Sequence, residues 1–194
     1  MKKGFRLFLT LTPLLFVIDQ LVKVWARDTA KGIENTSLGA PIPGVFELKL
    51  VYNEGVAFGM FQGAGLLLAP VAVAITIIAA WYSWKNDSEK SVSHVTAALL
   101  ASGALGNLVD RLAHGKVTDM FWIRAINFPV FNIADVCITI AGALLVLGAV
   151  GDLAGQKNTR REETRSLTAG DESSVTSGEE SSRVQMESHN EHCS

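Results

Sequence analysis

Four long apolar segments constrain this chain more than any other feature of its sequence. They run approximately over Phe5 to Ala26, Ala64 to Trp84, Val92 to Leu112 and Asn132 to Leu153. Each has close to the roughly 20 mostly apolar residues that an α-helix needs to cross a bilayer. A length of 194 residues would suit one soluble domain, but apolar residues gathered into such blocks are typical of a membrane protein. The segments therefore predict a mainly α integral membrane protein with four transmembrane helices.

The charges near the N-terminus indicate how the first helix crosses. It opens on a basic cluster of Lys2, Lys3 and Arg6. This cluster favours a cytoplasmic N-terminus by the positive-inside rule. The apolar run is too long for a cleavable signal peptide and is interrupted by Asp19 and Lys23, so we interpret it as a permanent helix. Four crossings then place both termini in the cytoplasm and leave two outer connections, Arg27 to Gly63 and Ala113 to Phe131.

The first outer connection has the sequence signals of a small β-sheet. Val45 to Tyr52 alternates in polarity and is rich in β-branched and aromatic residues, which predicts a strand. Gly55 and Gly59 flank a predicted tight loop. Asn53 precedes this loop, so a local turn cap is a structural explanation for it. We expect the sheet to lie on the outer membrane surface.

One four-residue pattern, Asn followed by two apolar residues and Asp, closes the third apolar segment and opens the fourth. It occurs as Asn107 to Asp110 and as Asn132 to Asp135. Helical spacing places each Asn on the side of its Asp, and the predicted topology brings both acids to the outer membrane face. Ionisable groups at membrane depth cost about 2.5–3.5 kcal/mol each, so the pair is a functional-site hypothesis.

Structural explanations of the same residues stay open. Asn132 could cap the fourth helix, with Asp135 in its first turn, where an acid favours the helix dipole. Asp110 beside Arg111 could be interfacial charge with a snorkelling arginine. Under either explanation these residues would have a structural role and no catalytic role.

Two carboxylates at one site suit acid–base hydrolysis. One ionised acid accepts a proton from water, and the other, protonated, donates to the carbonyl or the leaving group. Close like charges in a desolvated site cannot both ionise, which gives the two acids different roles. We predict Asp110 and Asp135 as this pair, without a metal or a cofactor. Asp119 in the second outer connection is a weaker rival, and Asp19 has the i, i+4 spacing of an intrahelical ion pair with Lys23.

Two other functional classes fit parts of the pattern. A proton-coupled transporter also needs intramembrane acids, but these acids cluster at one face and the chain has no inverted repeat in its hydropathy. A presenilin-type membrane protease would carry a GxGD motif, whereas Asn107, Leu108 and Val109 precede Asp110.

Five motifs that occur in this order resemble lipoprotein signal peptidase, signal peptidase II. They are VIDQLVK, NEGVAFG from Asn53, GALGNLVDR from Gly103, VTDM with Asp119, and FNIAD from Phe131. The resemblance covers about residues 14 to 150. It implies a four-helix membrane aspartyl endopeptidase whose small extracytoplasmic sheet cradles the substrate. The family cleaves prolipoproteins before a cysteine that carries diacylglycerol, and globomycin inhibits it.

The resemblance also implies roles for individual residues. Asp110 and Asp135 match the catalytic dyad. The supporting or substrate-binding residues are Asn53, Asn107, Arg111, Asn132, Ala134, Asp19 and Lys23. We therefore expect a monomer in the bacterial cytoplasmic membrane that contacts lipids and lipidated precursors and does not bind nucleic acid.

The composition changes after the last apolar segment. Residues 155–194 are rich in Ser, Glu, Thr and Arg and contain few large apolar residues. Such a segment cannot bury a core, which predicts disorder. The sequence thus divides into a membrane peptidase domain, residues 1–154, and a disordered cytoplasmic tail, residues 155–194.

Overall fold

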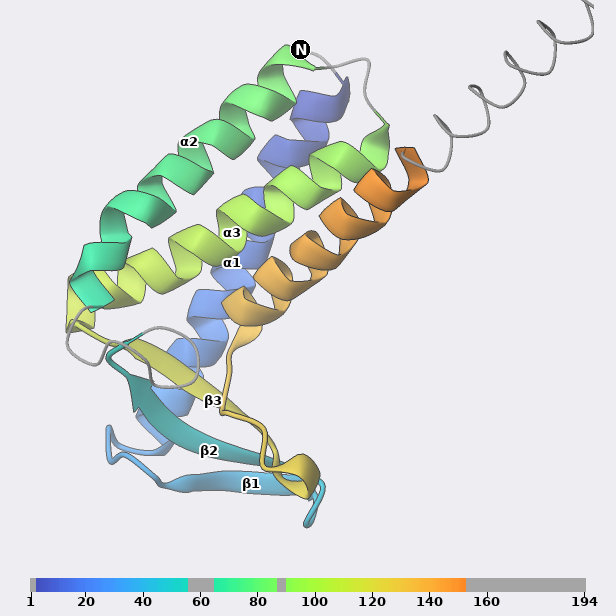
Figure 1. The fold of residues 1–194 in the computed structure, drawn as a ribbon. Helices are drawn as coiled ribbons and strands as arrows, with labels where there is room; N and C mark the ends of the chain where they lie inside the picture. The colour runs from blue at the N-terminus through green and yellow to red at the C-terminus, as the bar shows by residue number, and fades with distance from the viewer. Residues whose placement is uncertain (1–2, 56–64, 87–89, 153–194) are drawn as a thin grey trace, which may run out of the picture. The chain divides into compact units, whose positions relative to one another are not determined.

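A computed structural model of the chain describes residues 3–55, 65–86 and 90–152 (Figure 1). Met1–Leu145 form one compact unit, and the described residues after Leu145 belong to a second unit. The predicted disordered tail and Gly59 of the predicted tight loop lie outside the described residues, so both stay predictions.

The apolar segments form helices. These are α1, Lys3–Thr29, α2, Ala69–Lys85, α3, Ser91–His114, and the helix Ile133–Asp152. Among the described residues, three helices are long and apolar enough to cross a membrane: α1, α3 and Ile133–Asp152. Helix α2 has 17 residues and follows a short 3-10 helix, η2, Gly65–Leu68. The mainly helical membrane class is confirmed, whereas the count of four spanning helices stays a prediction.

Helix α3 is more buried than α1 and packs against both α1 and α2 (Figure 1). In its most apolar stretch 67% of the residues are buried, against 22% in α1. Two glycines allow its neighbours to come close. A Cβ on Gly103 would lie 2.6 Å from the backbone oxygen of Ala134, and a Cβ on Gly106 would lie 2.5 Å from Oδ2 of Asp19. Because small residues let helix backbones approach closely, polar groups of two other helices can meet on this face of α3.

The two long connections meet in one antiparallel sheet of order β1-β2-β3. Its strands are β1, Ser37–Ile42, β2, Phe46–Asn53, and β3, Val117–Ile123. The predicted strand Val45 to Tyr52 is confirmed as β2, shifted by one residue. Strand β3 was not predicted, and the 3-10 helix η3, Arg124–Ile126, follows it. The sheet therefore joins segments that lie about 70 residues apart in the chain.

A small apolar cluster attaches the sheet to the end of α1. Ala26 and Ala30 of this end pack with Leu50 of β2 and Met120 of β3, and all four are buried. Strand β3 contacts both α1 and α3. This attachment brings Asp119, the residue before Met120, to the end of the helices where the polar residues of α1 and α3 lie.

Candidate active site

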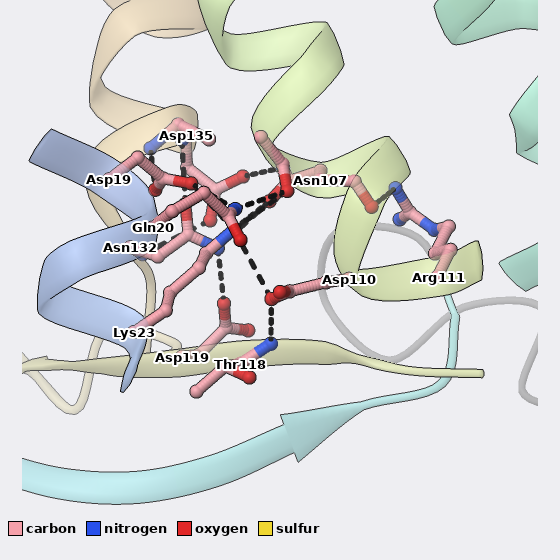
Figure 2. A network of polar contacts seen from close by, with 12 residues as sticks. Asp19, Gln20, Lys23, Asn107, Asp110, Arg111, Thr118, Asp119, Asn132 and Asp135 are labelled. Carbon is pink, nitrogen blue, oxygen red and sulfur yellow. Dashed lines mark hydrogen bonds and ion pairs between the residues drawn. The ribbon is translucent and has the colours of Figure 1, made fainter. Parts of the chain in front are cut away.

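Polar side chains gather where α1 and α3 end, where the helix Ile133–Asp152 begins, and along the start of β3 (Figure 2). We call them the polar network. Its members are Asp19, Lys23, Arg27, Asn107, Asp110, Thr118, Asp119, Asn132 and Asp135. Most are almost fully buried, although burying a charge is costly unless it is paired. The contacts of each group therefore indicate what it can do.

Lys23 lies at the centre of the network. Its Nζ is 3.0 Å from Oδ2 of Asp19 and 3.3 Å from Oδ2 of Asp110. It also donates to Oδ1 of Asn107 at 3.0 Å and to the backbone oxygen of Gly106 at 3.2 Å. The intrahelical pair with Asp19 expected from the sequence is thus present, but the same ammonium group also ties α1 to α3.

Asp19 connects the three helices. Its Oδ1 accepts a hydrogen bond from the backbone N–H of Ala134 at 2.9 Å, and its Oδ2 faces Lys23. The lack of a side chain at Gly106 leaves room for this carboxylate. Asp19 and Ala134, two of the predicted supporting residues, therefore position the start of the helix Ile133–Asp152 against α1.

Asp110 is paired with two cations and is 1% exposed. Its Oδ2 lies 3.3 Å from Nζ of Lys23 and accepts the backbone N–H of Thr118 at 2.9 Å. Its Oδ1 lies 3.4 Å from a guanidinium nitrogen of Arg27. The explanation of Asp110 as interfacial charge is wrong, because the carboxylate is buried in an ion-pair cluster.

Asn132 and Asp135 cap the helix that they open. Oδ1 of Asn132 accepts the backbone N–H of Asp135 at 3.0 Å, and Oδ2 of Asp135 accepts the backbone N–H of Asn132 at 3.2 Å. This reciprocal arrangement is a capping box with an acid at the third helical position. The capping explanation is confirmed, but capping uses only one oxygen of Asp135. The other oxygen, Oδ1, accepts a hydrogen bond from Nδ2 of Asn107 at 2.9 Å.

Asp119 of β3 contacts the side chain of Asn132. Nδ2 of Asn132 donates to Oδ1 of Asp119 at 2.6 Å, and the backbone N–H of Asn132 donates to Oδ2 of Asp135, so one residue joins the two acids (Figure 2). Burial, followed by the negative charge of Asp135, raises the pKa of Asp119 from its ordinary value of 3.8 to about 7. Hydrogen bonds from Asn132 and Asn53 and the charge of Lys23 oppose this rise. Asp119, the weaker rival in the sequence, thus has the strongly perturbed pKa that is typical of functional acids.

Asn53 and Arg111 lie at the edge of the network. Oδ1 of Asn53 accepts the backbone N–H of Gly55 at 3.0 Å, which confirms the turn cap, and the same side chain hydrogen-bonds to Asp119. Arg111 donates to the backbone oxygens of Asn107 at 3.4 Å and Gly55 at 3.2 Å. Arg111 therefore attaches the end of β2 to α3.

The structure thus brings together every residue that the sequence predicted for the site, and it adds Arg27 and Thr118. Arg27 donates to the hydroxyl of Thr118 at 2.8 Å as well as pairing with Asp110. The spacing of Asp19, Lys23 and Arg27 at i, i+4 and i+8 on one helix face could have revealed Arg27. Thr118 had no such signal, because its role depends on a strand that the sequence analysis missed.

The charges of the site do not balance when all groups are ionised. Four carboxylates, those of Asp19, Asp110, Asp119 and Asp135, face three cations, those of Lys23, Arg27 and Arg111. One additional proton restores neutrality, and the raised pKa of Asp119 favours that proton on Asp119. A protonated acid beside an ionised acid is the arrangement that aspartic hydrolysis requires.

The sequence of this chain is similar to those of proteins of known family. The model of the family described as signal peptidase (SPase) II matches residues 11–150. The lipoprotein signal peptidase of Symbiobacterium thermophilum is 36% identical over 147 residues, which cover 74% of this chain and 94% of that protein. The lipoprotein signal peptidase of Clostridium acetobutylicum is 31% identical over 134 residues, covering 68% of this chain and 85% of the relative.

Two solved structures have a fold similar to that of this chain. A structure described as a bacterial membrane enzyme, determined by the in meso method at 2.3 Å resolution, has a TM-score of 0.67 and 26% sequence identity. The match covers 75% of this chain and 88% of that one. A second structure with the same description, at 1.9 Å resolution, has a TM-score of 0.66.

Proposed function

Since the chain belongs to the signal peptidase II family, we propose that Asp119 and Asp135 form its acid–base pair. The protein is a bacterial membrane hydrolase that removes signal peptides from prolipoproteins. The proposed pair keeps Asp135 from the sequence hypothesis and replaces Asp110 by Asp119. The reason lies in what each acid contacts.

The observation that carries this proposal is the contrast between Asp110 and Asp119. Asp110 has two cationic partners, Lys23 and Arg27, and a backbone donor, the N–H of Thr118. Asp119 has no ion pair among the described residues, and burial, followed by the charge of Asp135, raises its pKa to about 7. Proton transfer requires a group that can change its protonation state near neutral pH. Asp119, with a pKa of about 7, satisfies this requirement, whereas Asp110 is held in ion pairs with Lys23 and Arg27.

The roles of the two acids follow from their surroundings. Asp135 is less buried than Asp119, and its two carboxylate oxygens each accept a hydrogen bond, so it is suited to take a proton from water. Protonated Asp119 donates to the oxygen of the scissile carbonyl while that water attacks the carbon. The C–N bond of the tetrahedral intermediate then breaks: Asp135 gives its proton to the leaving amine, and Asp119 takes back a proton from a hydroxyl of the intermediate as the carbonyl re-forms. Water is the nucleophile, and both acids regain their initial states.

The remaining residues of the network hold this pair. Asn132 and Asn107 orient the carboxylates of Asp135 and Asp119 through the hydrogen bonds described above. Lys23 and Asp19 fix the helix ends, and Arg111 and Asn53 hold the start of the adjoining loop. Asp110 serves as the anion that joins α1, α3 and β3.

We also propose that the protein crosses the membrane four times, with both termini in the cytoplasm and the site at the outer leaflet. Helix α2 and the preceding η2 together span roughly 33 Å, at about 1.5 Å per α-helical residue and about 2.0 Å per 3-10 residue. This length matches the ~30 Å hydrocarbon core of a bilayer. A site at the outer leaflet would receive a precursor whose cysteine carries diacylglycerol, cleave before that cysteine, and bind globomycin-type inhibitors as a monomer among membrane lipids.

The test of the acid pair is a comparison of three Asp→Asn variants, assayed in detergent on a lipidated precursor. Asp119→Asn and Asp135→Asn should each lower kcat by more than about 1,000-fold, because acid and base act as a unit. Asp110→Asn retains an acceptor for the N–H of Thr118 and should keep measurable turnover with lower thermal stability. An inactive but stable Asp110→Asn, together with an active Asp119→Asn, would restore the pair expected from the sequence.

The rate should also depend on pH with a known sign. The general acid must carry its proton, so kcat should fall as pH rises through the pKa of Asp119, near 7. It should fall again at acid pH, when the base becomes protonated. A rate that stays level from neutral to alkaline pH would exclude Asp119 as the acid, although the two limbs belong to the coupled pair.

A further inference from the structure

We propose that Arg27 is a positioning residue that holds Asp119 in place by binding the hydroxyl of Thr118. This inference rests on the proposed function, because it concerns the acid assigned there. Arg27 does not touch Asp119 in any contact that the structure gives, so its effect passes through Thr118 and Asp110.

Two hydrogen bonds hold Thr118 of β3, and we call this pair of contacts the clamp. The backbone N–H of Thr118 donates to Oδ2 of Asp110 at 2.9 Å, and its hydroxyl accepts from Arg27 at 2.8 Å. The same guanidinium nitrogen lies 3.4 Å from Oδ1 of Asp110, which closes a ring of three groups. Thr118 is fully buried. The backbone N–H and the hydroxyl of Thr118 are therefore both used, the N–H by α3 and the hydroxyl by α1.

The neighbouring sheet does not fix Asp119 as firmly. Tyr52 and Val51 of β2 pair with Thr118 and Asp119, but the register of the two strands shifts between Val51 and Leu48. Such an irregularity interrupts the ladder of a sheet and lets a strand bend. The clamp on Thr118 lies directly before Asp119, on the other side of it from this interruption. It can thus supply the restraint that the interrupted ladder lacks.

A restraint at this position matters for catalysis because proton transfer is sensitive to small displacements. A shift of about 1 Å can cost on the order of a hundredfold in rate. Asp119 is faced by Lys23 of α1, Asn53 of β2, Arg111 of α3, and Asn132 and Asp135 at the start of the following helix. Arg27 and Asp110 contact its neighbour, Thr118. Releasing the clamp should let Asp119 move away from Asp135 and towards water. Its apparent pKa should then fall.

The hydrogen bond between Arg27 and Thr118 can be removed by a substitution at either residue. Thr118→Val keeps the shape and the backbone N–H and removes only the hydroxyl. Arg27→Gln removes the guanidinium while Lys23 still neutralises Asp110, and Arg27→Lys keeps the charge. The matched control is Arg124→Gln, which removes an exposed arginine at the end of β3 whose ion pair, 2.7 Å to Glu47, has no contact with Thr118.

The full-length protein in detergent should give the following results with a lipidated precursor. Arg27→Gln and Thr118→Val each lower kcat about tenfold with little change in KM, and the alkaline limb of the pH profile moves to lower pH. The kcat of the double variant is no lower than that of the less active single variant, because both changes remove the same interaction. Arg27→Lys restores part of the rate, and Arg124→Gln behaves like the unaltered protein.

The outcomes separate this inference from the proposed function. If Arg27→Gln is folded and keeps both kcat and the alkaline limb, while Asp119→Asn is inactive, the positioning role is wrong and the acid pair stands. If the two single losses multiply in the double variant, Arg27 does not act through Thr118. An active Asp119→Asn would instead overturn the proposed function, and the positioning role with it.

Discussion

Two of the places where the described part of the helix bundle buries polar side chains differ in charge, and only one of them contains ion pairs. The polar network joins the ends of α1 and α3 to β3 through charged groups. The second place lies near the start of α1 and α3, where Oγ of Ser83 is 2.9 Å from Nδ1 of His94 and both side chains are fully buried. No ion pair among the described residues involves Ser83 or His94.

This difference shows that the burial of polar side chains does not by itself identify an active site. The His94 ring packs over Gly4 of α1, where any side chain would overlap it, so this contact holds three helices together. The polar network also holds helices together, but its four carboxylates outnumber by one the cations of Lys23, Arg27 and the adjoining Arg111. That imbalance produces a proton that can be exchanged near neutral pH. We therefore propose a structural role for the Ser83–His94 contact and a catalytic role for the polar network.

The largest expected effect is that of Lys23→Met. This change leaves the carboxylates of Asp19 and Asp110 buried without their shared partner. Breaking a buried pair in this way typically costs about 3–5 kcal/mol. Thermal unfolding in detergent should show a large loss of stability and the activity should be lost with it. A variant as stable as the unaltered protein would mean that Lys23 does not hold the network together.

A matched pair of Gly→Ala variants should sharpen the comparison. Gly106→Ala places a methyl group 2.5 Å from Oδ2 of Asp19, and Gly4→Ala pushes against the His94 ring. Overpacking of this kind costs roughly 1–3 kcal/mol. Both variants should be less stable, but only Gly106→Ala should lower the kcat of the folded fraction and alter its pH profile. A changed pH profile in Gly4→Ala would contradict the division between the two places.

The smallest effect should come from Ser83→Ala. The change removes the hydrogen bond to His94 and should cost about 1 kcal/mol, the usual net contribution of such a bond. It should leave kcat and KM for the lipidated precursor unchanged. A tenfold loss of kcat at normal stability would show that the His94 cluster takes part in function after all.

Much of the fold was predictable from the sequence because the apolar segments and their lengths are local properties. The four helices, the strand β2 and the gathering of both Asn-x-x-Asp motifs follow from hydrophobic periodicity. Strand β3 was missed because VTDMFWI lacks clear alternation: in the structure its first four residues are buried. Such a short apolar run cannot be assigned by periodicity alone.

The sequence predicted the members of the candidate site, and which two acids form the pair stays a prediction. The sequence favoured Asp110 because it repeats the spacing of Asp135, but spacing does not reveal that two cations hold Asp110. Asp119 was ranked lower because it was expected in a loop without a partner acid. Its proximity to Asp135 depends on β3 and on the amide of Asn132, which are long-range contacts that the local pattern does not encode.

The central claim, that Asp119 carries the exchangeable proton, is tested most directly by infrared titration of its carboxyl group. The C=O band of a protonated acid that is present in the unaltered protein and absent from Asp119→Asn reports this one group. We predict a midpoint near pH 7, which moves down when Asp135→Asn removes the neighbouring charge. A midpoint near the ordinary value of 3.8, unchanged in Asp135→Asn, would contradict the account.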